Sequence, residues 1–109
     1  MASDYKILGQ SNPSATTLTD IYTVPGATQT VGSRIVVCNR SATPTAFRIS
    51  VAVGGAADNN KQYLAYDAPI GANEIVPLTI GPTLDATDVV RVYATLATLS
   101  FNLFGNELT

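Results

Sequence analysis

The sequence predicts an all-β fold, a single-domain antiparallel β-sandwich of about eight strands that is jelly-roll-like. Three observations predict it. Runs rich in Val, Ile, Thr, Tyr and Phe recur at spacings of roughly 8 to 12 residues. Gly, Pro, Asn and Asp separate these runs, and no helical repeat of apolar residues connects them. Because 109 residues suffice for one modest core, we expect one domain, residues 1–109, with a short N-terminal arm over about residues 1–14.

The first half of the chain contains four of the expected strands, at residues 5–10, 16–24, 34–40 and 45–53. Turn formers follow the first strand at Asn12-Pro13 and the second at Pro25-Gly26. The fourth strand alternates clearly. One of its faces carries Phe47, Ile49, Val51 and Val53, and the other carries Arg48, Ser50 and Ala52. We expect the first face to be buried and the second to be exposed.

The second half contains four more expected strands, at residues 61–68, 73–80, 89–95 and 99–105. A loop rich in Gly, Asp and Asn, residues 54–60, precedes the first of them. Simple alternation places Tyr63 and Tyr66 on opposite faces of that strand. Pro77 cannot donate to a β-ladder, so its strand is expected at a sheet edge or a bulge.

Alternation in the last two strands leaves apolar groups on both faces. Val90, Val92 and Ala94 share one face, and so do Leu99, Phe101 and Leu103 in the final strand. The opposite faces carry Tyr93 and Phe104, and charged residues make up only 13% of the chain against roughly 25% in typical soluble domains. Two explanations stay open: the solvent-facing sides simply tolerate Thr, Ser and Tyr, or neighbouring subunits cover part of this surface.

Catalytic and metal sites are excluded mainly by the residue types present. The chain has no His and one Cys, so it lacks the base of a Ser-His-Asp or Cys-His site and the ligands of a zinc site. Asp85 and Asp88 lie close in sequence without the pattern of a calcium loop, and we expect them to accept backbone amides in a turn. Cys38 is expected to fill the core. We therefore expect no enzymatic activity, no metal and no cofactor.

The charge pattern argues against nucleic-acid and membrane partners. The net charge is -2, and the six Lys and Arg residues are scattered, whereas phosphate binding needs clustered cations. The longest apolar runs are far shorter than the roughly 20 residues of a membrane helix, and the N-terminus has no secretory apolar region. We expect a soluble protein that is made in the cytosol.

A resemblance to a known group adds to this interpretation. Nearly the whole chain follows the pattern YKILGQ, TTLTDIYTVP, RIVVCNRS, LDATDVVRVYAT and SFNLFGNEL. In this pattern the chain resembles small virion structural proteins of tailed bacteriophages. The resemblance implies a head decoration, or cement, protein on the capsid surface, assembled in the host cytoplasm. Its implied partners are the major capsid protein and copies of itself, and it carries no catalytic residues.

Two other functions remain open at this stage. The same low-charge sandwich would serve as a tail, collar, baseplate or fibre-associated component. A carbohydrate-binding module is the other alternative, because jelly rolls host lectins and the chain has five Tyr, although it has no Trp.

Assembly through strand edges and terminal segments would need no special side chains. We therefore expect a homo-oligomer, a trimer, with interface candidates near both termini. The candidates are Tyr5, Tyr22, Phe104 and Leu108. The alternative for each of them is a place in the core.

Overall fold

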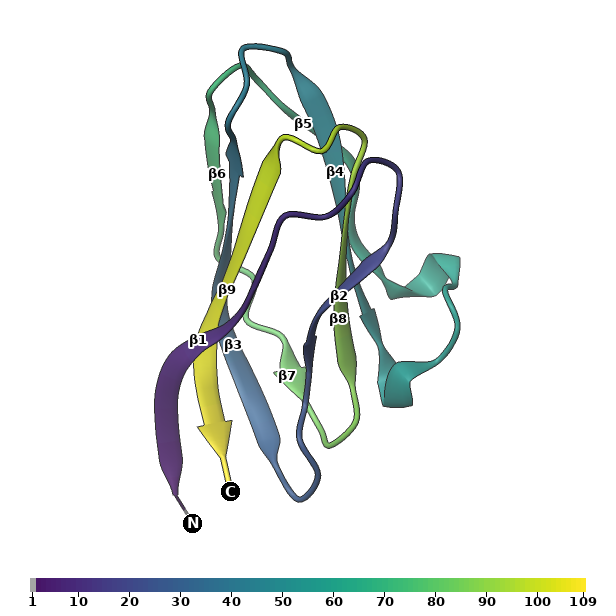
Figure 1. Cartoon of the computed structure of the whole chain (residues 1–109). Coiled ribbons are helices and arrows are strands. Elements are labelled where there is room, and N and C mark those ends of the chain that lie inside the picture. Colours follow the sequence, from purple (N-terminus) through teal and green to yellow (C-terminus); the bar gives the residue numbers. More distant parts are fainter. Residues whose placement is uncertain (1) are drawn as a thin grey trace.

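The computed structural model describes residues 2–109 and confirms an all-β sandwich of two antiparallel sheets (Figure 1). Sheet A has the order β1 (Ser3–Ser11), β9 (Leu99–Leu108), β3 (Gln29–Asn39) and β6 (Ile75–Leu78), and β7 (Thr83–Leu84) also pairs with β3. Sheet B has the order β2 (Thr19–Thr23), β8 (Val89–Ala94), β4 (Thr45–Ala52) and β5 (Tyr63–Ile70). Two short 3-10 turns, η1 (Val53–Gly55) and η2 (Asn60–Gln62), lie between β4 and β5.

All eight expected strands are present, and β7 is an additional one. Strand β3 begins at Gln29 instead of residue 34, because its first half pairs with β9 and β7 although it carries few apolar residues. β7 is only two residues long, which is too short to give a periodic signal. β6 lies at the end of its sheet, as Pro77 predicted.

The segment expected as an N-terminal arm contains β1. From Ser3 to Ser11 it pairs with β9, with one irregularity between Ile7 and Gly9. The backbone of Ala2 and that of Thr109 exchange two hydrogen bonds of 2.9 Å, so the two chain ends lie side by side. Met1 lies outside the described residues.

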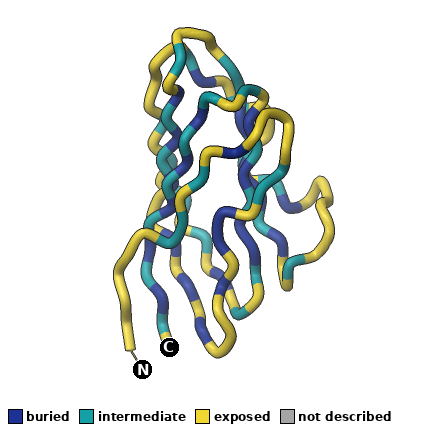
Figure 2. The backbone as a smooth tube through the Cα atoms, viewed as in Figure 1, coloured by how far each residue is buried: buried dark blue, intermediate teal, exposed yellow. Residues whose placement is uncertain are grey.

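The core lies between the two sheets, where the buried segments of the facing strands run side by side (Figure 2). The alternation expected for β8 and β9 is confirmed: Val92, Leu99 and Phe101 are fully buried. Phe101 of sheet A meets Phe47 of sheet B edge to face, with ring centres 6.1 Å apart. This contact joins the two sheets near the start of β4 and of β9.

The alternation expected for β4 is wrong at its C-terminal end. Val53, expected in the core, is 78% exposed, whereas Ser50 and Ala52, expected outside, are fully buried. The reason is the connection from β4 to β5, which folds back over the outer face of sheet B. The Arg91 side chain holds this connection by donating to the Ala56 carbonyl at 2.8 Å.

The expected separation of Tyr63 and Tyr66 is also wrong. Their rings pack edge to face with centres 5.0 Å apart. The pairing of β4 with β5 shifts register on both sides of Ile49, so strict alternation along β5 is lost.

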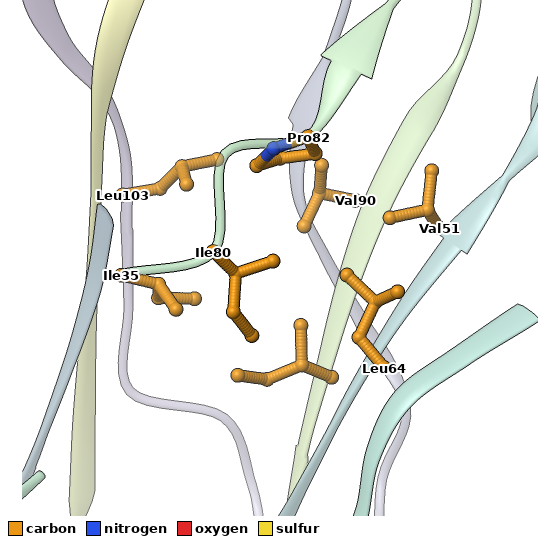
Figure 3. Close-up of a pocket in the computed structure, with 8 residues that line it drawn as sticks. Ile35, Val51, Leu64, Ile80, Pro82, Val90 and Leu103 are labelled. Atoms are coloured by element: carbon orange, nitrogen blue, oxygen red, sulfur yellow. The ribbon is translucent and has the colours of Figure 1, made fainter. Parts of the chain in front are cut away.

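One apolar gap between the two sheets is too small to hold a ligand. Eight side chains line a cavity of about 10 Å³, and Ile80 and Pro82 of the β6–β7 connection close it between the sheets (Figure 3). This volume is about enough for one water molecule.

The strands of sheet A approach each other closely at Gly105. A Cβ at this position would lie 2.6 Å from the Val31 carbonyl oxygen and 2.7 Å from Leu8 Cδ1. Gly105→Ala is expected to lower the free energy of unfolding by about 1–3 kcal/mol, because the backbone of β3 must shift. Thermal unfolding followed by circular dichroism measures this loss. The control is Gly26→Ala, where a Cβ would meet nothing within 4 Å; equal losses in both variants would contradict the expectation.

Candidate interaction surface

The outer face of sheet A is a weakly charged surface that four of the described strands form. Here "sheet A outer face" means the outward side chains of four strands. They are Ser3, Tyr5, Ile7, Gln10, Ser100, Asn102, Phe104, Asn106, Leu108, Gln29, Val31, Arg34, Val36, Cys38, Ile75 and Pro77. Within residues 2–109, Arg34 is the one charged side chain in this set.

Strand register brings the apolar members of this face together. Ile7 of β1 lies opposite Phe104 of β9, which in turn lies opposite Arg34 of β3. In the next row Tyr5 and Val31 flank Asn106. Tyr5 is 82% exposed and Ile7 50%, although each has a large apolar side chain. Burial of such groups against another surface is favourable.

Three of the four interface candidates from the sequence lie on the sheet A outer face. Tyr5 is exposed, and Phe104 and Leu108 are half-buried, in neighbouring rows of β1 and β9. Tyr22 does not join them. It lies in β2 of the other sheet, is 8% exposed, and points between the sheets.

Tyr22 belongs to a buried polar cluster that ties the two sheets together. Its hydroxyl donates to Glu107 Oε2 at 2.5 Å and lies 2.7 Å from Thr30 Oγ1. Lys6 Nζ lies 2.6 Å from Glu107 Oε1. The Glu107 carboxylate is therefore shared between β1 of sheet A and β2 of sheet B.

The protonation states of the cluster follow from these contacts. Hydrogen bonds from Lys6 and then Tyr22 lower the pKa of Glu107 below its ordinary value, so this carboxyl is ionised. Burial, together with the hydrogen bond to Glu107, raises the pKa of Tyr22 to about 12. Every member thus has a partner in its favoured charge state, which makes the cluster a structural link between the sheets.

The outer face of sheet B differs from that of sheet A because its charges are paired within the chain. The Arg48 guanidinium lies 4.1 Å from the Tyr66 ring centre and 4.4 Å from that of Tyr93, and its Nε lies 2.7 Å from Asp67. Both rings thereby stabilise the cation. The sequence did not reveal this cluster, because the register shifts that bring its members together leave no trace in the spacing of residues.

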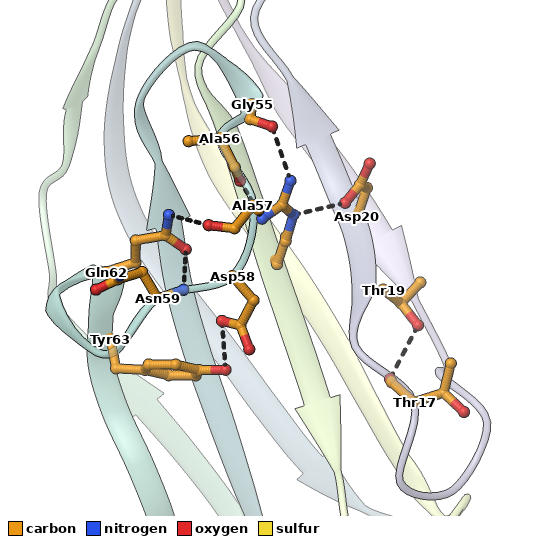
Figure 4. A network of polar contacts seen from close by, with 11 residues as sticks. Thr17, Thr19, Asp20, Gly55, Ala56, Ala57, Asp58, Asn59, Gln62 and Tyr63 are labelled. Atoms are coloured by element: carbon orange, nitrogen blue, oxygen red, sulfur yellow. Dashed lines mark hydrogen bonds and ion pairs between the residues drawn. The ribbon is translucent and has the colours of Figure 1, made fainter.

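Arg91 organises the other half of the sheet B outer face, and its partners Asp20, Gly55 and Ala56 are labelled in Figure 4. Its Nε lies 3.0 Å from Asp20, and its two terminal nitrogens donate to the carbonyls of Ala56 and Gly55. Next to it, the Tyr63 hydroxyl donates to Asp58 at 2.8 Å. These contacts fix the β4–β5 connection on the sheet.

Two further expectations concern single residues. The structural role of Asp85 and Asp88 is confirmed, since Asp88 accepts from the amides of Asp85 and Gly54, each at 2.9 Å. The core position expected for Cys38 is wrong. Cys38 lies half-buried on the outer side of β3, because the buried positions of this strand are the alternate ones, Val37 and Asn39.

Residues 2–109 hold no group of three or more His, Cys, Asp or Glu side chains that could bind a metal ion. They also form no helix that is long and apolar enough to span a membrane. Comparison of the chain with protein-family models, curated proteins and solved structures gives no match. The geometry of the two outer faces therefore carries the functional argument.

Glu107→Gln tests the buried cluster. Because the folded-state pKa of Glu107 lies below its ordinary value of 4.5, the carboxylate stabilises the fold above that pH and loses this effect as the pH falls through the folded-state value. We expect the variant to be less stable by about 1–2 kcal/mol at pH 7, and this difference to shrink below pH 4.5. Melting temperatures of both proteins from pH 7 to 3 measure it. A difference that stays constant over this range would contradict the assignment.

Proposed function

We propose that this protein is a non-enzymatic structural protein of a bacteriophage virion, a decoration or cement protein that oligomerises on the head exterior and stabilises the capsid lattice. The observation that carries the proposal is the sheet A outer face, which has one cation, Arg34, among exposed and half-buried side chains that are apolar or uncharged polar. Such a face suits contact with other protein surfaces.

The resemblance to phage virion proteins supports the proposal at the same place in the molecule. Its opening segment, YKILGQ, lies in β1, and its closing segment, SFNLFGNEL, lies in β9. These two neighbouring strands supply Tyr5, Ile7, Phe104 and Leu108 to the sheet A outer face. The stretches that carry the resemblance are therefore the stretches that form the candidate surface.

The strand order supports the jelly-roll interpretation. With the short β7 set aside, the strands pair as they would in one long folded hairpin: β1 with β9, β2 with β8, β3 with β6 and β4 with β5. The hairpin then closes on itself where β9 meets β3 and β8 meets β4. Jelly rolls recur in viral capsid domains, so this order agrees with a place in a virion.

A cement protein needs contact area and no chemistry. A module that binds only the assembled lattice stabilises that lattice by mass action, as any ligand stabilises the state it prefers. Many equivalent copies add avidity even where each contact is weak. The filled interior and the internally paired charges of sheet B agree with a rigid module of this kind.

A tail, collar, baseplate or fibre-associated component is the second candidate within the virion. The same outer face would serve it. Copy number distinguishes the two, because tail parts follow closed cyclic symmetry and occur in small multiples, whereas a capsid carries a decoration protein at many lattice positions. The position of the protein in a cryo-EM map of the particle decides between them.

A carbohydrate-binding module is favoured by one observation. Tyr63 and Tyr66 line a shallow depression with Asn60 on the sheet B side, where aromatic rings and polar groups meet. However, Arg48 already lies over the ring of Tyr66, and the two tyrosine rings are nearly perpendicular. Glycan binding on an array, lost in Tyr63→Ala, would support this function. No glycan binding by the wild-type protein would argue against it.

Capsid binding of two Val→Ser variants tests the main proposal. Val31 is 41% exposed in the middle of the sheet A outer face, and Val53 is 78% exposed beyond sheet B. In co-sedimentation with empty capsids, we expect Val31→Ser to weaken binding by about tenfold, because an apolar contact is lost, and Val53→Ser to bind like the wild type. A wild-type protein that does not bind capsids, or a weaker effect at Val31 than at Val53, would contradict the proposal.

A further inference from the structure

Sheet A has a free edge along part of β1. β1 is the last strand of its sheet, and no other described strand pairs along its outer side (Figure 1). Residues 3–7 are all exposed, whereas further along Gly9 lies against the backbone of Ile21 in β2. The open part of the edge is therefore limited to the N-terminal half of β1.

Backbone geometry shows which groups this edge offers. Ala2 and Thr109 exchange both of their hydrogen bonds, so they form a narrow pair of the antiparallel ladder. Such hydrogen-bonded pairs recur at every second residue, so the N–H and C=O groups of Asp4 and Lys6 also point toward β9. The N–H and C=O groups of Ser3, Tyr5 and Ile7 consequently point away from the sheet. They are free to pair with another strand.

We propose that β1 pairs antiparallel with β1 of a second copy of this chain, around a two-fold axis at Tyr5. This pairing specifies the self-association that the proposed function invokes, and its biological role rests on that function. In this register Tyr5 faces Tyr5 of the second copy, and Ser3 faces Ile7 of the second copy. The three facing pairs exchange two hydrogen bonds each.

Charge selects this register over its neighbours. Because outward backbone groups occur at every second residue, the second strand can shift only in steps of two residues. A shift in one direction places Asp4 opposite Asp4 of the second copy, and a shift in the other places Lys6 opposite Lys6 of the second copy; like charges directly opposite are destabilising. The two-fold at Tyr5 instead sets Asp4 opposite Lys6 of the second copy, twice. The edge is thus complementary to itself in one register.

The side chains are available for this pairing. Asp4 and Lys6 are 67% and 43% exposed, and Lys6 keeps its contact with Glu107 while its ammonium has further hydrogens to donate. Tyr5, 82% exposed in the single chain, would pack on Tyr5 of the second copy. The two A sheets would become one continuous sheet, and the two copies of the sheet A outer face would lie side by side. This pairing would give a two-fold dimer, which differs from the trimer expected from the sequence.

Native mass spectrometry and sedimentation at micromolar concentration test the oligomeric state first. We expect a dimer. A strictly monomeric or a trimeric wild-type protein would overturn the proposal, because an isologous edge closes with two copies.

Cysteine pairing then tests the register. In a Cys38→Ser background, Tyr5→Cys is expected to form a disulfide-linked dimer under mild oxidation, since narrow pairs have Cα atoms about 5.5 Å apart, within disulfide range. Ile7→Cys is the control, because residue 7 faces residue 3 of the second copy. Cross-linking through residue 7 but not residue 5 would overturn the register.

Two further variants separate backbone pairing from side-chain contact. Tyr5→Pro removes the N–H that points outward and leaves the β1–β9 ladder intact, and it is expected to weaken the dimer at least about tenfold more than Tyr5→Ala does. Asp4→Lys places like charges opposite each other and is expected to give monomers. Melting temperatures confirm that each variant is folded, and a dimer that withstands both Tyr5→Pro and Asp4→Lys would exclude this edge.

The outcomes for the two proposals are distinguishable. A monomer that binds capsids would overturn the β1 pairing and leave the proposed function in place. A dimer that forms the expected cross-link but does not bind capsids would overturn the proposed function and leave the pairing in place.

Discussion

The fold depends on β9, which pairs on both sides within sheet A. Its inward residues Leu99, Phe101 and Leu103 are buried against sheet B, and β1 and β3 are hydrogen-bonded to its two edges. Because side chains alternate strictly along a strand, burial of this set fixes which residues of sheet A face outward. The same alternation that buries Phe101 places Phe104 and Leu108 on the sheet A outer face.

The small number of charged residues matters less than where the fold uses them. Lys6, Arg48 and Arg91 all lie in ion pairs with carboxylates of other strands. The Arg48 and Arg91 pairs have an exposed carboxylate, and ion pairs of this kind add little free energy individually. Their consequence is spatial: these charges lie along the inner side of β1 and on the outer face of sheet B, so the outer face of sheet A is left with Arg34.

The weakly charged face and the open edge of β1 adjoin each other at Tyr5 and Ile7. An exposed edge strand is ordinarily protected by charge, and an inward-pointing lysine is one such protection. In β1 that lysine is two residues from an aspartate of opposite sign, and it is already bonded to Glu107. The arrangement discourages pairing in general and permits it in one register, which is how a strand edge can be specific.

The sequence by itself determined the fold class, the alternation of β8 and β9, the edge position of Pro77 and the turn role of Asp85 and Asp88, because each is a local consequence of side-chain period or of turn chemistry. It also selected three residues of the outer face, Tyr5, Phe104 and Leu108, from their places near the chain ends.

Only the tertiary structure decided which strands are neighbours and what covers them. Tyr22 meets Glu107 across 85 positions of sequence, and register shifts beside Ile49 bring Tyr63 onto Tyr66. Arg91 holds the β4–β5 connection on sheet B, where Ser50 is buried and Val53 is exposed. These outcomes depend on long-range pairing and on irregularities of the ladder, and neither leaves a periodic mark in the chain.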